Sequence, residues 1–467
     1  MIKGSLWSIL GVVLSKGFLL ITWFVLARIL GKELYGEFGI IRSTIQMFAA
    51  FAGFGLGLTA TKHVAEYLHH DKEKVSNILS MAYAFATLLG LIVFVLVNIF
   101  AENIAKDSLG APYLENELRI ASVMILISSL NGAQTGVLQG FKAFDVIAKI
   151  NLVHGLISGL MFIFGAYFFS FYGAILALVL SLVLLFLLNA VRLRKLYSEN
   201  SIRLSFNGVI KEKKLLLNYS LPAALCGLVV SPVKWIVEAD MVRLGSGFAE
   251  MGIFQATLIF QILIMTLTKT INAPIITAMA SNRSVVSKKK DKLNISGVWL
   301  ISLFFVVPVM LFPEYLDFIL GSDYKGAKLN NTLTIVMLYT SFFLLTEGLA
   351  RVTIVENYLW LSFFNNLFWG IVLIISFKFL PKTSVGLSFA YLASYMITFV
   401  IFTPFYIKSG VVRKKIILEW QLILIIIALI FGAYLGFNEC SFFKKLIFTL
   451  ALFMGIIYKL KNDYLTH

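Results

Sequence analysis

Long apolar runs, separated by short polar segments, follow one another along the whole of this 467-residue chain. Each run has roughly 17–25 residues, the length that an α-helix needs to cross a bilayer. A transmembrane β-barrel would instead show short segments in which polar and apolar residues alternate. The pattern predicts an all-α polytopic membrane protein with about fourteen transmembrane helices, near residues 5–27, 36–60, 77–100, 119–140, 147–169, 172–192, 216–243, 250–280, 293–313, 329–350, 357–378, 385–407, 416–437 and 442–458.

Composition excludes the main alternatives. Hydrophobic residues make up 59% of the chain and charged residues 14%, and there are 42 phenylalanines. A soluble domain has about 25% charged residues, so a water-soluble or disordered protein and a multi-domain cytosolic enzyme are excluded. The two cysteines have neither a disulfide framework nor the spacing of a metal site. No P-loop motif is present, and we expect no metal and no cofactor.

The net charge of +16 indicates topology. Most basic residues lie in loops on the N-terminal side, including the loop 192–215 and the run Lys288–Lys290. Cytoplasmic loops of membrane proteins are enriched in lysine and arginine. Because an even number of spans leaves both ends on one side, we expect both termini in the cytoplasm, and we expect no nucleic-acid partner.

The chain contains an internal repeat. The segment 109–113 (LGAPY) matches 320–324 (LGSDY), and both stand at the outer end of the fourth span of a set of six. Weaker echoes join Arg28, Gly36, Phe38 and Tyr172-Gly173 to Arg243, Gly252, Phe254 and Val385-Gly386. Sets of six spans keep the same orientation, which indicates one of the two symmetries of secondary transporters. The predicted parts are an N-lobe at 1–195, a cytoplasmic linker at 196–215, a C-lobe at 216–408 and two extra spans with a cytoplasmic tail at 409–467.

Two such lobes around a central cavity favour transport over catalysis, so we do not expect an enzyme. No large outward loop is present for a polysaccharide polymerase. Within the spans, Pro274 is expected to interrupt 250–280, and the glycines of 53–57 are expected to let helices pack closely inside 36–60.

Charged residues within spans are costly and are candidates for function. Three cations have no acidic residue one helical turn away: Lys16, Arg42 and Lys269. Such a set suits an anionic passenger, since lysine and arginine bind phosphate well. The alternatives are ion pairs with other helices or, for Arg42, extension to the outer interface.

Other polar residues have two interpretations each. Lys234 could line the cavity or pair with Glu238 at i+4. Asn151 and Gln255 could bind sugar hydroxyls, as could other polar residues of the spans, or they could join helices. These others are Asn131, Gln134, Gln139, His154, Gln261, Asn365 and Asn366. The carboxylates Asp240 and Glu347 are candidates for ion coupling. Asp240 could instead be solvated, and Glu347 could pair with Arg351.

Several motifs together resemble a known family. They are ARILG at 27–31, YGEF at 35–38, GFGLGLTATK at 53–62, YSLP at 219–222 and LGSDY at 320–324. Their order and spacing are similar to those of polysaccharide flippases of the MOP superfamily, which translocate O-antigen and exopolysaccharide units. These flippases are relatives of MATE exporters and of the lipid II flippase. The resemblance covers residues 1–408.

The resemblance implies a substrate, a location and partners. The substrate would be an undecaprenyl-pyrophosphate-linked oligosaccharide, moved from the inner to the outer leaflet of the bacterial inner membrane by alternating access. Basic residues in the first, second and eighth spans hold pyrophosphate in related flippases, and Lys16, Arg42 and Lys269 stand in those spans. Membrane lipids, a coupling proton or sodium ion, and the polysaccharide polymerase machinery are the further implied partners. A MATE-type cation or drug antiporter and a lipid II flippase remain the alternatives.

Overall fold

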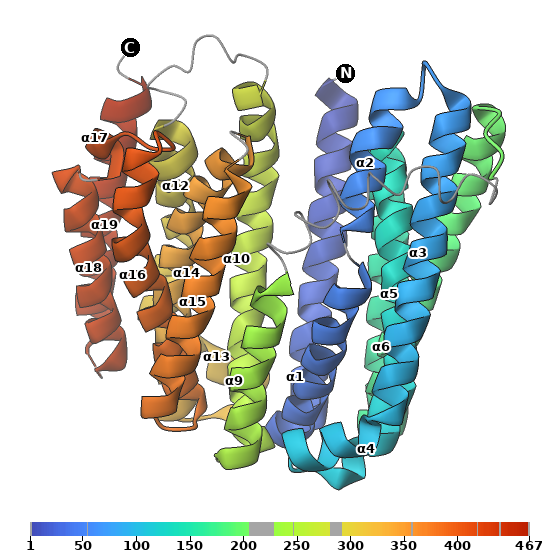
Figure 1. Ribbon diagram of the computed structural model, residues 1–467. Helices are drawn as coiled ribbons and strands as arrows, with labels where there is room; N and C mark the ends of the chain where they lie inside the picture. The colour runs from blue at the N-terminus through green and yellow to red at the C-terminus, as the bar shows by residue number, and fades with distance from the viewer. Residues whose placement is uncertain are drawn as a thin grey trace. The chain divides into compact units, whose positions relative to one another are not determined.

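The described residues of the computed structural model form helices joined by turns and short irregular segments, with no strand among them (Figure 1). It describes the backbone of residues 2–53, 55–204, 228–245, 247–280, 292–355, 358–417, 419–438 and 440–465, and no side chain of 2–16, 269–280, 316, 354–355, 359 or 464–465. The chain forms two compact units, Met1–Arg243 and Leu244–His467.

The first unit is a bundle built around two kinked helices, with α3 and α5 alongside them (Figure 1). Its elements are α1 (Ile2–Gly53), α2 (Leu56–Tyr67), α3 (Lys72–Ile99), α4 (Ala101–Asn103), η1 (Ile104–Ser108), η2 (Pro112–Leu114), α5 (Glu115–Gly140), α6 (Phe144–Glu199) and α9 (Val230–Leu244). The repeat assigns α9 to the C-lobe, whereas in the structure it belongs to the first compact unit. The lobe boundaries remain a prediction from the repeat.

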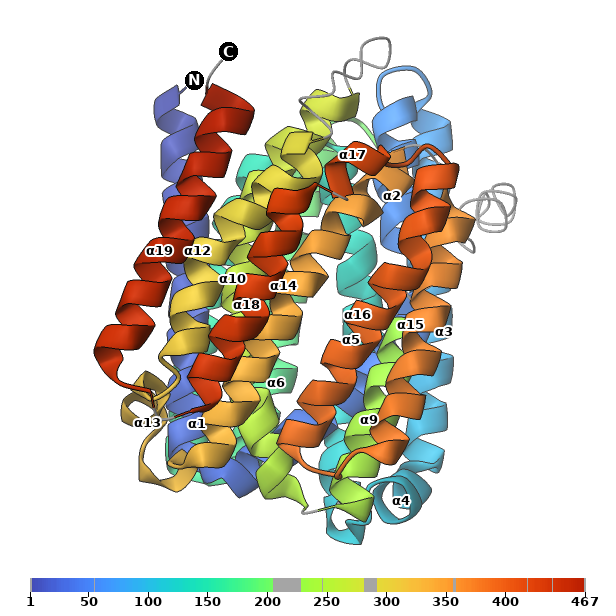
Figure 2. The same ribbon diagram turned by 90° about the vertical axis from the view of Figure 1, so that its left-hand side faces the viewer.

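The second unit packs α14 against α10, α12, α16 and α18 (Figure 2). Its elements are α10 (Phe248–Ala280), η5 (Leu293–Gly297), α12 (Val298–Leu311), α13 (Tyr315–Leu320), η6 (Ser322–Tyr324), α14 (Ala327–Val355), α15 (Leu359–Phe379), α16 (Ser384–Lys408), α17 (Lys414–Ile417), α18 (Trp420–Phe437), α19 (Phe442–Leu460) and η7 (Lys461–Leu465).

Nine helices in the described part of the chain are long and apolar enough to cross a membrane. The helix α6 holds two predicted spans, joined at Ser170, where φ is 51°. Gly31, with φ of 71°, likewise joins two predicted spans in α1. The predicted interruption at Pro274 is wrong, because α10 is helical through Ala280.

The glycines at 53–57 have two separate roles. The predicted continuous span 36–60 is wrong here, because α1 ends at Gly53 and α2 starts again after Gly55, whose φ is 65°. A left-handed residue at this place ends the first helix, and glycine adopts it without steric cost. The predicted close packing is confirmed at Gly57, where an added Cβ would lie 2.7 Å from the carbonyl oxygen of Gly132.

Gly136→Ala should lower the stability of the first unit by about 1–3 kcal/mol, the usual cost of overpacking. An added Cβ at Gly136 would lie 2.1 Å from the Gly57 carbonyl oxygen and 2.6 Å from its Cα. Both atoms are backbone, so α2 and α5 must separate. Gly132→Ala is the matched control, because its added Cβ meets no atom within 4 Å. Thermal unfolding in detergent measures both variants, and equal melting temperatures would contradict the close packing.

The two copies of the repeated motif share a glycine with positive φ that is followed by a short 3₁₀ turn. Gly110 and Gly321 both have positive φ, at 67° and 91°. Each is preceded by a buried leucine and followed by a short 3₁₀ turn, η2 or η6. The copies differ at their tyrosines, since Tyr113 is exposed and Tyr324 is buried. The sequence match at 109–113 and 320–324 thus corresponds to a local structural match.

Candidate functional site

Of the three predicted cations, Arg42 is the one whose side chain the structure describes. Arg42 lies in the second limb of α1, past the bend at Gly31, and is half-buried. Lys16 belongs to the first limb of α1, and Lys269 belongs to α10 of the second unit. The side chains of Lys16 and Lys269 lie outside the described residues, so their predicted role remains a prediction.

Arg42 lines a cavity of about 250 Å³ within the first unit. Its walls come from α1, α5 and α6, and they consist of Leu19, Trp23, Arg42, Gln46, Met124, Ser128, His154, Ser158, Phe162, Leu178, Ser181 and Leu182. Among the described residues that line it, one is an arginine and none carries a carboxylate. Such a cavity favours an anion, because a cation that is partly withdrawn from water is stabilised by a partner of opposite charge.

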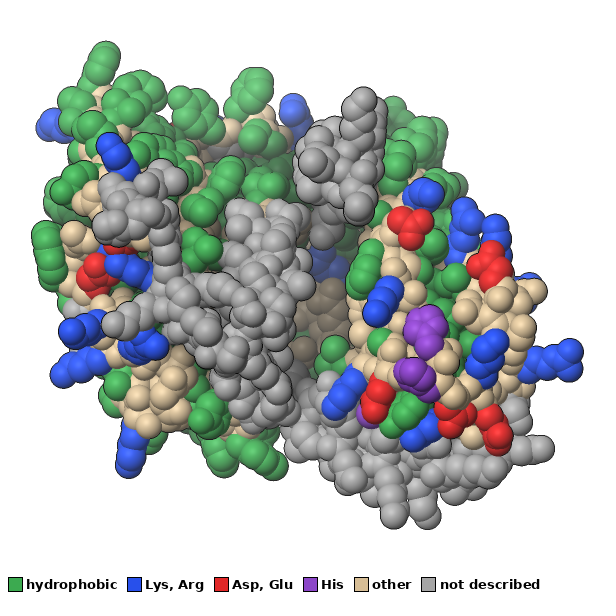
Figure 3. Space-filling model, turned by 90° about the horizontal axis from the view of Figure 1, so that it is seen from above, with side chains coloured by type: hydrophobic (Ala, Val, Ile, Leu, Met, Phe, Trp, Pro, Cys, Tyr) green, Lys and Arg blue, Asp and Glu red, His purple; other side chains and the backbone are tan. Residues whose placement is uncertain are grey.

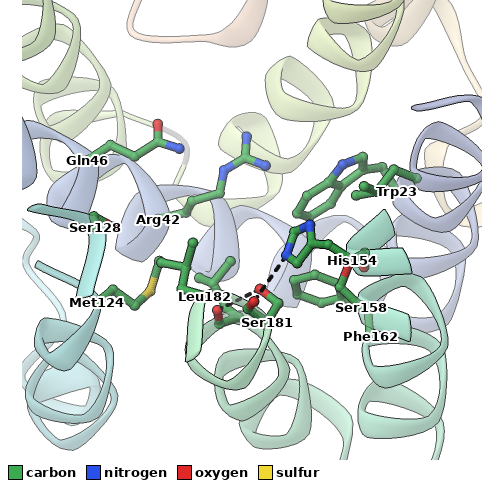
Figure 4. A pocket seen from close by; sticks show the side chains of 12 residues that line it. Trp23, Arg42, Gln46, Met124, Ser128, His154, Ser158, Phe162, Ser181 and Leu182 are labelled. Carbon is green, nitrogen blue, oxygen red and sulfur yellow. Dashed lines mark hydrogen bonds between the residues drawn. The ribbon is translucent and has the colours of Figure 1, made fainter. Parts of the chain in front are cut away.

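The side chains of this cavity present both flat apolar surface and hydrogen-bonding groups (Figure 4). The guanidinium carbon of Arg42 lies 4.9 Å from the centre of the Trp23 ring, a cation–π contact. His154 donates through Nε2 to the Ser181 carbonyl oxygen at 3.0 Å, which leaves Nδ1 as an acceptor in the neutral ring. Gln46 and Ser128 are labelled beside Arg42 in the same view. The cavity therefore offers a cation together with neutral donors and acceptors.

A second charged cluster adjoins Arg42 on the neighbouring residues of α1. Ser43 donates a hydrogen bond to Glu238 of α9, whose exposed fraction is 5%. Trp235 donates through Nε1 to Thr44 Oγ1 at 2.8 Å, which ties α9 to α1 again. Arg42 and Lys234 both stabilise the carboxylate of Glu238 electrostatically. Arg42 therefore both lines the cavity and interacts electrostatically with Glu238.

The remaining predicted site residues lie in varied surroundings. Lys234 interacts electrostatically with Glu238, and its predicted place in a cavity remains a prediction. Asn151 is exposed on α6 and is not among the described residues that line the cavity of Arg42, so its predicted role remains a prediction. Gln255 is buried in α10 of the second unit, with an exposed fraction of 4%. Asp240 lies 3.8 Å from Arg243 and is partly exposed.

Glu347 does not hold Arg351 in the way that the sequence predicts. Arg351 donates to the side-chain and main-chain oxygens of Asn294, both at 2.7 Å, and interacts with Glu347 only through space. The carboxylate of Glu347 is half-buried on α14. Its role in ion coupling remains a prediction.

Several other polar residues of the spans join helices. Asn131 donates to the Leu182 carbonyl oxygen at 3.0 Å, and Gln261 donates to Thr340 Oγ1 at 3.1 Å. His154 both joins two limbs of α6 and lines the cavity. Sequence reasoning missed Trp23 and Gln46. Gln46 could have been found, because it stands one helical turn after Arg42.

The family follows from comparison with known proteins. Residues 1–255 match the family model described as polysaccharide biosynthesis protein. A segment of 119 residues is 33% identical to the succinoglycan biosynthesis transport protein ExoT of Rhizobium meliloti (strain 1021). That match covers 26% of this chain and 22% of the relative. The matched segment therefore spans less than a quarter of the length of the relative.

Solved structures of transporters share the fold. The lipid II flippase MurJ in an inward closed conformation superposes with a TM-score of 0.73 at 16% identity, covering 98% of this chain and 100% of that one. An inward-facing MATE family multidrug resistance transporter of the MOP superfamily superposes with a TM-score of 0.65 at 17% identity, covering 85% and 94%. The predicted all-α transporter fold is confirmed, and this chain belongs to the polysaccharide biosynthesis protein family.

Proposed function

We propose that the protein is a flippase that moves an undecaprenyl-pyrophosphate-linked oligosaccharide from the inner to the outer leaflet of the bacterial inner membrane. The observation that carries the proposal is the guanidinium of Arg42 in a cavity whose described lining residues include no carboxylate. A guanidinium binds phosphate through paired, charge-assisted hydrogen bonds. Membership of a polysaccharide biosynthesis family supports a lipid-linked glycan over a drug as the anion.

The size of the cavity suggests which part of the substrate Arg42 meets. Pockets for drug-sized ligands hold roughly 300–1,000 Å³, and this cavity holds about 250 Å³. It suits a phosphoryl group and an adjoining sugar better than a whole repeat unit. In the proposed cycle the pyrophosphate meets Arg42 with Lys16 and Lys269 in the inward-open state. The prenyl tail stays in lipid while the lobes rock to release the glycan outside.

Glu238 is our candidate for the carboxylate that makes this cycle sensitive to pH. Its carboxylate and the substrate phosphate compete for the same cation, Arg42. Protonation of Glu238 would strengthen phosphate binding by Arg42, and loss of that proton would weaken it. Glu238 stands two residues before Asp240, one of the two carboxylates that the sequence suggests for ion coupling.

Glu238→Gln should therefore retain binding of the lipid-linked substrate and lose the pH dependence of its transport. A neutral amide cannot compete for Arg42 and cannot carry a proton. Transport in proteoliposomes, measured against internal and external pH, tests this. Asp240→Asn is the matched control, because Asp240 is partly exposed beside Arg243. An unchanged pH profile in Glu238→Gln, or a flat one in Asp240→Asn, would contradict the assignment.

The function itself is tested by deleting the gene and locating the lipid-linked oligosaccharide. We expect it to accumulate in the cytoplasmic leaflet while surface glycan is lost, and the wild-type gene should restore both. Normal surface glycan with altered drug sensitivity would indicate an antiporter instead. Lethality would indicate a lipid II flippase, and single repeat units on the surface would indicate a polymerase.

A further inference from the structure

A second pocket lies at the open end of the α6 hairpin. The helix turns back at Ser170, and its limbs cross closely, since an added Cβ at Gly173 would lie 2.0 Å from the Gly165 carbonyl oxygen. Asp145 and Lys195 lie equally far along the chain from Ser170, so the two ends of the hairpin meet. Between them is a pocket of about 220 Å³ lined by Asp145, Val146, Lys149, Arg192, Lys195, Leu196 and Glu199.

The walls of this pocket are fixed by the core behind them. Ile150 and Leu193 follow lining residues on each limb, and both are buried in a cluster with Val75 and Ile78 of α3. The pocket shares no lining residue with the cavity of Arg42. It is therefore a separate and structured site.

The pocket carries a net positive charge. Among the described residues that line it, three side chains are basic and two are acidic. Lys195 lies 3.8 Å from Glu199, so these two charges offset each other. Lys149, Arg192 and Asp145 remain, which leaves an excess of one positive charge. A phosphodiester carries a single negative charge and would balance it.

The limbs below the pocket expose apolar side chains. Leu180, Leu187 and Val191 follow one face of the second limb at helical spacing, with exposed fractions of 49%, 53% and 65%. On the first limb, Leu156 and Leu160 are similarly exposed. In a membrane-spanning helix such a face meets acyl chains. The basic residues thus stand at the end of a lipid-facing surface, at headgroup level.

Charged groups also cover the surrounding end of the first unit. The face seen in Figure 3 gathers lysine, arginine, aspartate and glutamate side chains around the histidines of this unit. Positive-inside topology assigns this end to the cytoplasm, and the cytoplasmic leaflet carries anionic lipids that basic pockets between helices bind.

We propose that the pocket between Lys149 and Arg192 binds the phosphate headgroup of an anionic phospholipid of the cytoplasmic leaflet. The acyl chains would lie along the exposed apolar faces of α6. Free phosphate would gain nothing from those faces, which is why we commit to a lipid.

Native mass spectrometry of the full-length protein tests the proposal, with phosphatidylglycerol and phosphatidylcholine titrated in separate experiments. We expect one phosphatidylglycerol to bind clearly more tightly than phosphatidylcholine. Lys149→Gln/Arg192→Gln should weaken it by about tenfold or more, because each basic residue near an anionic headgroup contributes roughly fivefold. Arg194→Gln/Arg203→Gln removes the same charge from exposed residues outside the pocket and should change binding less than about twofold.

A variant that is expected to strengthen lipid binding distinguishes the proposal from a folding defect. Asp145→Asn removes a repelling carboxylate and should strengthen phosphatidylglycerol binding, which misfolding would not do. Equal binding of both lipids, or unchanged binding in either pocket variant, would overturn the proposal. Displacement of the lipid by millimolar inorganic phosphate would assign the pocket to a free anion. Displacement by undecaprenyl pyrophosphate would assign it to the substrate path.

Discussion

Replacing Arg42 by glutamine should lower transport of the lipid-linked oligosaccharide by at least about tenfold. A hydrogen bond to a charged group contributes roughly 1.5–3 kcal/mol, and Arg42 is the charged side chain among the described residues that line the cavity. Glutamine keeps hydrogen-bond donors and much of the length, so the loss reports the charge. Surface glycan in the deletion strain, measured at matched protein level, is the readout.

Two further variants test why Arg42 matters. Arg42→Lys should keep part of the activity, because lysine binds phosphate as a point charge without the paired geometry of arginine. Arg119→Gln removes the same charge from an exposed residue that pairs with Glu115 at 2.6 Å, and transport should be unchanged. Full surface glycan with Arg42→Gln would remove this cavity from the mechanism.

The sequence predicts the transporter fold well because the bilayer imposes the pattern. A helix that crosses lipid must be apolar over its whole length, so each span is visible as a run of residues. The runs near 385–407 and 442–458 correspond closely to α16 and α19. The bends that join two spans are harder to predict from the sequence, because a change in backbone angle does not alter the pattern of apolar residues. Ser170 turns α6 with a positive φ at a residue type that rarely adopts it.

The candidate site could be predicted only in part. Arg42 stands out in the sequence, since a charge inside a span is costly. Glu238 does not, because Lys234 at i−4 explains it locally, whereas its hydrogen bond comes from Ser43 of a distant helix. Arg351 similarly binds Asn294 in place of the neighbouring Glu347. Spacing in the sequence identifies possible partners along one helix, but contacts between helices determine which side chains pair in the structure.

Helices α18 and α19, which lie outside the repeat, are joined to the rest of the second unit by a buried network of charged side chains. Lys459 near the end of α19 has an exposed fraction of 2%. Its Nζ lies 2.9 Å from Glu419 and 3.2 Å from Asp463, and it donates to Gln421 at 2.7 Å. Lys292 contacts the same two carboxylates at 3.2 and 2.6 Å. Two cations and two anions therefore alternate around one cluster.

Lys292 interacts strongly with the two carboxylates of this network. Burial alone would lower the pKa of the Lys292 ammonium, but the carboxylates of Asp463 and Glu419 outweigh burial and hold that pKa above its ordinary value. Lys292 precedes η5, Glu419 precedes α18, and Asp463 follows α19. The network thus joins three segments that are far apart in the sequence.

Lys459→Met should destabilise the second unit by about 3–5 kcal/mol, the usual cost of removing one partner from a buried ion pair. Methionine fills the space but leaves two carboxylates with Lys292 alone. Lys444→Met is the matched control on the same helix, because Lys444 is exposed, and it should stay within about 0.5 kcal/mol of wild type. Thermal unfolding in detergent measures both. If Lys459→Met unfolds at no lower temperature than Lys444→Met, apolar packing holds the terminal helices, and the network only sets their alignment.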